Sequence, residues 1–192
     1  MKKNAKMMVM GLVLVMVFCY AGPVLAETSV GGNTASVDLN FQVTIQNYIE
    51  FRVGTAGMTT DTINFSPSPA ELANSTAITG TGGDVGGSQV TVRLLSNTAQ
   101  VTITANNDTP NGLVNGGDFI NWESITTTDI GGLLVPPLLT NAGGETSPGS
   151  PLIGAQNITT TWQYEYTRRA ADPIPTVPGN YVGIVTYIAS NP

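Results

Sequence analysis

Residues 36–45 read Ser36-Val-Asp-Leu-Asn-Phe-Gln-Val-Thr-Ile45, a strict alternation of polar and apolar side chains. Successive side chains of an extended chain point to opposite sides, so this pattern predicts one β-strand with an apolar face and a polar face. The apolar face carries five side chains: Val37, Leu39, Phe41, Val43 and Ile45. A strand this close to the start of a chain either joins the sheet of its own molecule or is donated to a neighbouring one. The sequence leaves both alternatives open.

Seven further stretches are candidate strands: residues 49–53, 62–65, 89–95, 100–105, 118–125, 158–166 and 179–188, with the cleanest alternation in 89–95 and 100–105. We expect 89–95 and 100–105 to form a hairpin through Ser96-Asn97-Thr98, and the last two stretches to pair with each other. Residues 69–74 are compatible with one helical turn, and no longer amphipathic helix is indicated. The pattern predicts an antiparallel β-sandwich of about seven or eight strands.

The first 26 residues have the layout of a secretory signal peptide. Lys2, Lys3 and Lys6 precede an apolar run from Met7 to Ala21, and small residues end the segment at Ala26. The run is shorter than the about 20 residues that span a bilayer, so we expect cleavage after residue 26 rather than a retained membrane span. The predicted organisation is a signal peptide (1–26), a flexible tail (27–35) and a single sandwich domain (36–192). The expected location is extracellular or at the cell surface, reached through the periplasm.

The composition of residues 27–192 excludes several classes of function. This part of the chain contains no His, Cys or Lys, and its four arginines stand against 13 acidic residues. A negative net charge disfavours nucleic-acid binding, and the missing residue types remove Ser-His and Cys-His nucleophile pairs and ordinary zinc or copper sites. Glu123, Glu165 and Asp172 could act only as paired carboxylates, and their spacing brings no two of them together. We therefore predict a protein that is not an enzyme and has no cofactor and no metal.

Three other stretches are candidate binding sites. The most apolar loop contains Leu133, Leu134, Val135, Leu138 and Leu139, and it either covers an end of the sandwich or forms an exposed patch for a partner. The Asn- and Asp-rich loop 106–118 favours turn chemistry over calcium binding, which the sequence does not decide. Trp162, Tyr164 and Tyr166 share one face of a strand; we favour a core position over a platform for sugar rings.

The opening strand, the short strand Thr62-Ile-Asn-Phe65 and the final Val177-Pro-Gly-Asn-Tyr-Val-Gly-Ile-Val-Thr-Tyr187 resemble the spore-coat-U-type subunits of archaic chaperone–usher pili. The chain differs from these subunits in having no Cys in its first strand. The resemblance implies an incomplete immunoglobulin-like sandwich that is completed by an N-terminal strand from the next subunit. It also implies a periplasmic chaperone and usher as partners.

These observations lead to two hypotheses. The first is an exported structural subunit of a pilus, fimbria or surface matrix that associates with copies of itself by β-strand addition. The alternative is a secreted, monomeric β-sandwich that binds polysaccharide or a cell surface through exposed aromatic side chains or the apolar loop.

Overall fold

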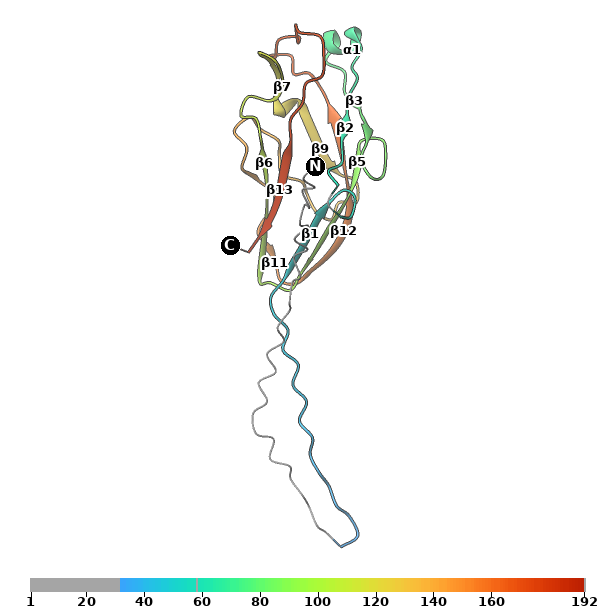
Figure 1. Cartoon of the computed structure of the whole chain (residues 1–192), viewed down its shortest axis with the longest axis vertical. Helices are drawn as coiled ribbons and strands as arrows, with labels where there is room; N and C mark the ends of the chain where they lie inside the picture. The colour runs from blue at the N-terminus through green and yellow to red at the C-terminus, as the bar shows by residue number, and fades with distance from the viewer. Residues whose placement is uncertain (1–31, 58, 192) are drawn as a thin grey trace, which may run out of the picture. The chain divides into compact units, whose positions relative to one another are not determined.

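The computed structural model describes residues 32–57 and 59–191. The chain divides into two units, one ending at Thr44 and the other beginning at Ile45. The predicted signal peptide (1–26) and residues 27–31 of the predicted tail lie outside the described residues. Residues 32–44 belong to no helix or sheet, and Figure 1 draws this blue segment as a plain trace without a strand arrow. The alternation of residues 36–45 is therefore not part of a strand ladder in the described chain.

The second unit contains two main antiparallel sheets. In the first, the order of hydrogen-bonded strands is β1-β5-β12-β3, and β9 also pairs with β12. Its strands are β1 (Ile49–Val53), β3 (Ile78–Thr79), β5 (Gln89–Ser96), β9 (Ile125–Asp129) and β12 (Gln156–Tyr166). Most residues of β12 are β-branched or aromatic, and β5 contains the β-branched run from Val90 to Val92; such residues suit a pleated, half-buried surface.

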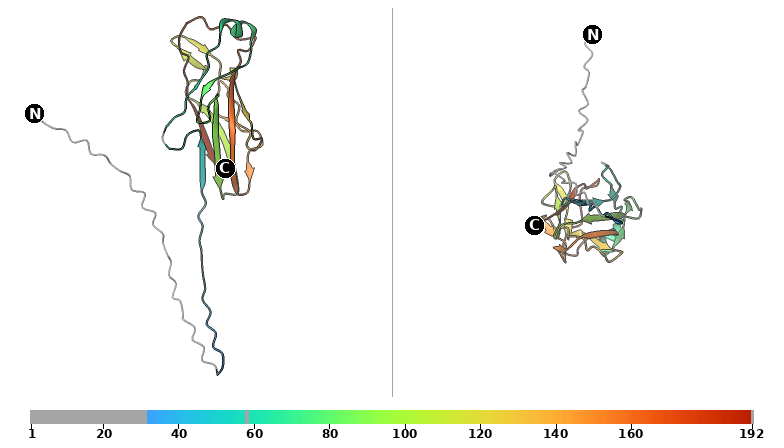
Figure 2. Two further views of the ribbon diagram at one scale, coloured as in Figure 1. Left: turned by 90° about the vertical axis from the view of Figure 1, so that its right-hand side faces the viewer. Right: turned by 90° about the horizontal axis from the view of Figure 1, so that it is seen from below.

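The second sheet is built around β6 (Gln100–Asn107). Strand β13 (Val185–Ser190) pairs with β6, as do two very short strands, β10 (Glu145–Thr146) and β11 (Leu152–Ile153). The axes of the long antiparallel strands are nearly aligned with one another (Figure 2). The remaining elements are β2 (Ile63–Asn64), β4 (Thr81–Gly82), β7 (Leu113–Asn115), β8 (Asp118–Ile120), the helix α1 (Pro69–Asn74) and the 3-10 helix η1 (Trp122–Ser124).

The core lies between the two sheets. Every second residue of β5 and β6 is buried: Val90, Val92 and Leu94 on one sheet, Val101, Ile103 and Ala105 on the other. Trp162 of β12 is fully buried and meets Tyr187 of β13 with ring centroids 5.2 Å apart. The two sheets thus share one hydrophobic core, and the predicted antiparallel β-sandwich is confirmed.

The structure corrects three local predictions. Strands β5 and β6 do not form a hairpin, because β5 pairs with β1 and β12 whereas β6 belongs to the other sheet. Strands β12 and β13 do not pair either, since β13 pairs with β6. The strand expected over 118–125 is split into β8, η1 and the start of β9. Period-two patterns identify strands, but the partner of each strand is set by long-range packing, which the pattern does not report.

The predicted helical turn at 69–74 is confirmed as α1, and its sequence explains where it begins. Ser68 precedes it as N-cap, and Pro69 occupies the first turn. The Ser68 side chain accepts a hydrogen bond from the Glu71 backbone N–H, while the Glu71 carboxylate accepts one from the Ser68 N–H. This capping box satisfies two backbone donors that have no partner within the helix. Within the described residues, no helix has both the length and the apolar character needed to cross a membrane.

Candidate functional site

The five predicted strand-exchange residues share one property: all are solvent-exposed. Their exposed fractions range from 64% for Val37 to 85% for Val43. Singly exposed apolar residues are ordinary on protein surfaces, but five on one face of an alternating segment are not. These five residues are Val37, Leu39, Phe41, Val43 and Ile45.

Strands β1 and β13 are edge strands of the two main sheets. In the described chain, β1 pairs only with β5, and β13 pairs only with β6. Strands β1 and β13 approach one another across the two sheets, with Cα atoms within 8 Å, but no ladder joins them. The unpaired backbone groups of such edges are available to another strand.

The inward-facing side chains of these two strands are incompletely covered. Interior strands bury alternate residues fully, whereas the inward residues of β1 and β13 are only partly buried, although they pack against the core. We call these two strands, with their inward residues, the open edge. The inward residues of the open edge are Ile49, Phe51, Val53, Val185, Tyr187 and Ala189.

One member of the open edge carries a polar group into the core. The Tyr164 hydroxyl donates a hydrogen bond to the Tyr187 hydroxyl at 3.1 Å. Desolvation by burial raises the pKa of Tyr187 to about 12, and it also raises the pKa of Tyr164. Trp162, Tyr164 and Tyr166 are all buried, which confirms the core position and excludes an exposed platform of these three rings.

A residue not singled out from the sequence, Asn97, holds the chain just before β1. Its side-chain Oδ1 accepts a hydrogen bond from the Tyr48 N–H at 2.8 Å, and its Nδ2 donates to the Gln46 carbonyl at 2.9 Å. The Asn97 backbone N–H also donates to the Tyr48 carbonyl at 3.3 Å. Asn is common in turns for local reasons, so its sequence position alone does not reveal contacts to residues about 50 positions away.

The predicted interaction loop combines both alternatives left open by its sequence. Leu134 and Leu139 are buried, while Leu133, Val135 and Leu138 are between 48% and 63% exposed. The Trp162 indole N–H donates to the Leu134 carbonyl at 2.7 Å, which ties the loop to the core. The loop therefore covers part of the sandwich and exposes three apolar side chains on its outer side.

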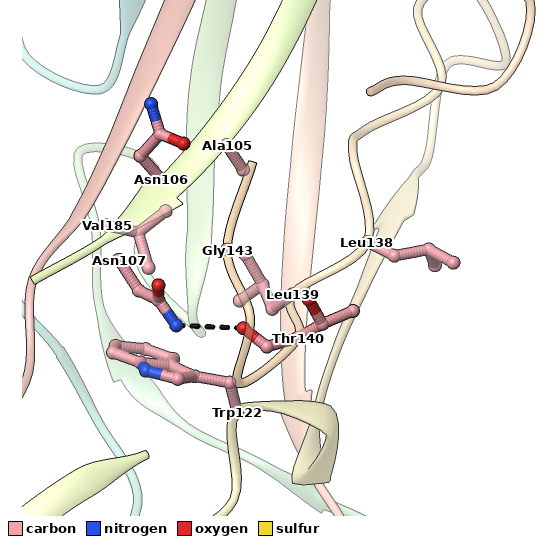
Figure 3. A pocket seen from close by; sticks show the side chains of 9 residues that line it. All are labelled: Ala105, Asn106, Asn107, Trp122, Leu138, Leu139, Thr140, Gly143 and Val185. Carbon is pink, nitrogen blue, oxygen red and sulfur yellow. Dashed lines mark hydrogen bonds between the residues drawn. The ribbon is translucent and has the colours of Figure 1, made fainter. Parts of the chain in front are cut away.

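A small hollow lies beside this loop, where Leu139 approaches β6 and β13 while the Leu138 side chain points away from them (Figure 3). The hollow leaves no room for a water molecule, and the Asn107 side-chain amide donates to the Thr140 carbonyl across it at 2.8 Å. Trp122 lies against it and is almost completely buried. Its lining contains amides, a hydroxyl and apolar groups but no ionisable side chain, so it offers no acid or base for catalysis.

The two carboxylates of the Asn- and Asp-rich loop 106–118 accept hydrogen bonds from another part of the chain. Asp108 accepts a hydrogen bond from the Ile184 N–H. Asp118 accepts bonds from the backbone N–H groups of Thr176 and Val177 and from the Tyr181 hydroxyl. These bonds, that from Thr176 first, lower the pKa of Asp118 from 3.8 to about 2. Both carboxylates link the loop to the segment that precedes β13.

Glu123 and Asp172, which the sequence spacing did not bring together, both lie near the guanidinium of Arg169. Arg169 lies 2.9 Å from an oxygen of Asp172 and 4.0 Å from an oxygen of Glu123. The hydrogen bond from Arg169 lowers the pKa of Asp172. A lowered pKa keeps a carboxyl group ionised, whereas general-acid catalysis by a carboxyl pair needs one member with a raised pKa. Within the described residues, no group of three or more His, Cys, Asp or Glu side chains could hold a metal ion.

Comparisons of the chain with protein-family models, with curated protein sequences and with solved structures find no match.

Proposed function

We propose that this protein is an exported structural subunit of a pilus, fimbria or surface matrix, and that its copies associate by β-strand addition. One observation carries the proposal. The same chain has an N-terminal segment with five exposed apolar side chains on one face, and a sandwich whose open edge is unpaired and incompletely covered. Each feature supplies what the other lacks.

The hydrophobic gain of such an exchange is of the same order as the cost of association. Burying five side chains of this size contributes roughly 1.5–3 kcal/mol each, on the order of 10 kcal/mol in total. A donated strand also gives the backbone groups of the open edge hydrogen-bond partners along its length. Association costs about 4–15 kcal/mol in lost freedom of motion, and ordering the segment adds to this. The two sums are comparable, so a stable polymer needs most of the five side chains to be buried together.

The expected surroundings of the protein fit this role. A subunit that exposes an apolar strand and an open edge would aggregate if it were released without protection. The resemblance to archaic chaperone–usher subunits supplies a periplasmic chaperone and an usher as partners that shield these surfaces before assembly. Export by the signal peptide at residues 1–26 would bring the chain to that compartment.

The test is the size distribution of the purified, exported full-length chain. Strand exchange gives a ladder of multimers that persists in detergent and shifts to monomer only on strong heating. A chain that remains monomeric at high concentration refutes the proposal. If that monomer is retained on polysaccharide beads, the protein is a binding module instead.

A further inference from the structure

We infer that Asn97 is a positioning residue that prevents the N-terminal segment from filling the open edge of its own molecule. The inference rests on the proposed function, because it explains how a chain that contains both a donor segment and an acceptor edge avoids pairing them internally. It is carried by the hydrogen bonds of Asn97 to Gln46 and Tyr48 and by the register of β1.

The first step concerns the conformation that Asn97 imposes. The Gln46 carbonyl and the Tyr48 N–H both point toward the Asn97 side chain. In an extended strand, residues two apart direct their backbone groups to the same side, so Gln46, Asn47 and Tyr48 are held as an extension of β1. The primary amide of Asn97 has the donor and acceptor of a peptide group and continues the β1–β5 ladder past its last backbone pair, Ile49 with Ser96.

The second step concerns the stiffness of the turn that carries Asn97. The flanking Ser96 and Thr98 are buried, and their hydroxyl groups are 2.8 Å apart. The Thr98 N–H donates to the Ser96 hydroxyl, and the Thr98 hydroxyl donates to the Gln100 carbonyl. These side chains fix the crossing between the sheets, so the amide of Asn97 is presented in one orientation.

The third step concerns how the chain would have to reverse for the N-terminal segment to fill the open edge of its own molecule. We call a reversal that directs the five apolar side chains inward the productive reversal. The inward residues of β1 are odd-numbered, as are the five apolar residues of the segment. A two-residue loop of Gln46 and Asn47 would pair Ile45 with Tyr48 and direct the apolar side chains to the outer face. A loop of Gln46, Asn47 and Tyr48 would pair Ile45 with Ile49 and direct them inward.

The productive reversal therefore uses the three residues that the bonds of Asn97 keep extended. Forming that loop requires the loss of both side-chain hydrogen bonds of Asn97 and of its backbone bond to Tyr48. Donation to a second copy requires none of these losses. Asn97 thereby biases the segment toward intermolecular pairing.

A disulfide trap tests this in dilute solution. In the productive reversal Thr44 and Glu50 are directly opposite, about 5 Å apart between Cα atoms, whereas along an extended chain they are about 20 Å apart. Both are exposed and even-numbered, so Thr44→Cys and Glu50→Cys leave the apolar face intact. Cys19 is the only natural cysteine and lies in the predicted signal peptide.

The full-length, exported double-cysteine chain should form little intramolecular disulfide under mild oxidation. Adding Asn97→Ala should raise the rate roughly tenfold, since two hydrogen bonds that oppose the reversal are lost. Asn97→Asp keeps an acceptor for the Tyr48 N–H but has no donor for the Gln46 carbonyl, so its rate should fall between these values. Asn157→Ala, an exposed asparagine on neighbouring β12, is the matched control and should leave the rate unchanged.

Rapid formation of the intramolecular disulfide in the chain that retains Asn97 overturns the inference. Equal rates of disulfide formation with Asn97 and with Asn97→Ala overturn it as well. If Asn97→Ala fails to fold, the comparison of Asn97→Asp with Asn157→Ala decides in the same way. Failure of the proposed function looks different. A chain that never forms multimers, yet traps quickly only when Asn97 is replaced, refutes assembly and retains the role of Asn97.

Discussion

Replacing Phe41 with Ala should weaken assembly and leave the folded domain unchanged. Phe41 is 82% exposed and lies outside every sheet of the described chain. Substitutions at such surface positions usually change the free energy of unfolding by less than about 0.5 kcal/mol. The melting temperature of the monomer should therefore match that of the unaltered chain.

The effect on assembly follows from the surface that Phe41 still has to bury. Full burial of a phenylalanine side chain contributes up to about 3 kcal/mol, and most of that surface is in water before assembly. Its loss should cost about 2 kcal/mol for each intermolecular contact, which lowers the association constant roughly 30-fold. The measurement is a dilution series in which light scattering follows the fraction of multimers.

Gln42→Ala provides the control. Gln42 is adjacent to Phe41 and is also exposed, but it lies on the polar face of the segment. A donated strand directs this face away from the acceptor core, so its association constant should change less than about threefold. Equal effects of the two substitutions would show that the alternation plays no part in assembly. A loss of domain stability in Phe41→Ala would show that the side chain already has a partner within its own molecule.

Three further outcomes test the fold. The pKa of Asp118 is lowered from 3.8 to about 2, so its contribution to stability is complete above about pH 4 and is lost as the pH falls toward 2. Asp118→Asn should flatten that part of a plot of melting temperature against pH. Leu94→Ala removes a fully buried side chain and should reduce the free energy of unfolding by about 2–5 kcal/mol in a urea titration. Leu139→Ser should destabilise by a similar amount because Leu139 is buried, whereas Leu138→Ser, at an exposed neighbour, should change stability by less than about 0.5 kcal/mol. Equal effects of these two serines would contradict the observed orientation of the loop.

The sequence predicts the long strands well because apolar and polar residues alternate along each of them, and this alternation shows which face is buried. Residues 89–95, 100–105 and 158–166 were expected as strands and form most of β5, β6 and β12. Pairing could not be predicted in the same way. Ser96, Asn97 and Thr98 have the composition of a hairpin turn, yet the chain crosses here from one sheet to the other, and the hydroxyl groups of Ser96 and Thr98 bond to each other.

The same distinction applies to the candidate site. The five apolar residues of 36–45 are visible in the sequence because they are local and periodic. The open edge is not visible, because it depends on which strands remain unpaired on one side after all others have paired. Asn97 is hidden for a related reason: its contacts to Gln46 and Tyr48 exist only because β1 ends its pairing opposite Ser96.

The length of β5 bears directly on whether the N-terminal segment is retained or donated. Its ladder with β1 runs from Val92 to Ser96, where β5 ends opposite Ile49. Asn97 extends this pairing only as far as Gln46, so an in-line continuation of β1 meets no further residues of β5. Joining its own sheet therefore requires residues 36–45 to reverse direction, and that reversal breaks the bonds of Asn97. In the proposed assembly, a second copy would offer the same open edge without that loss, and burial of five apolar side chains would favour pairing with it.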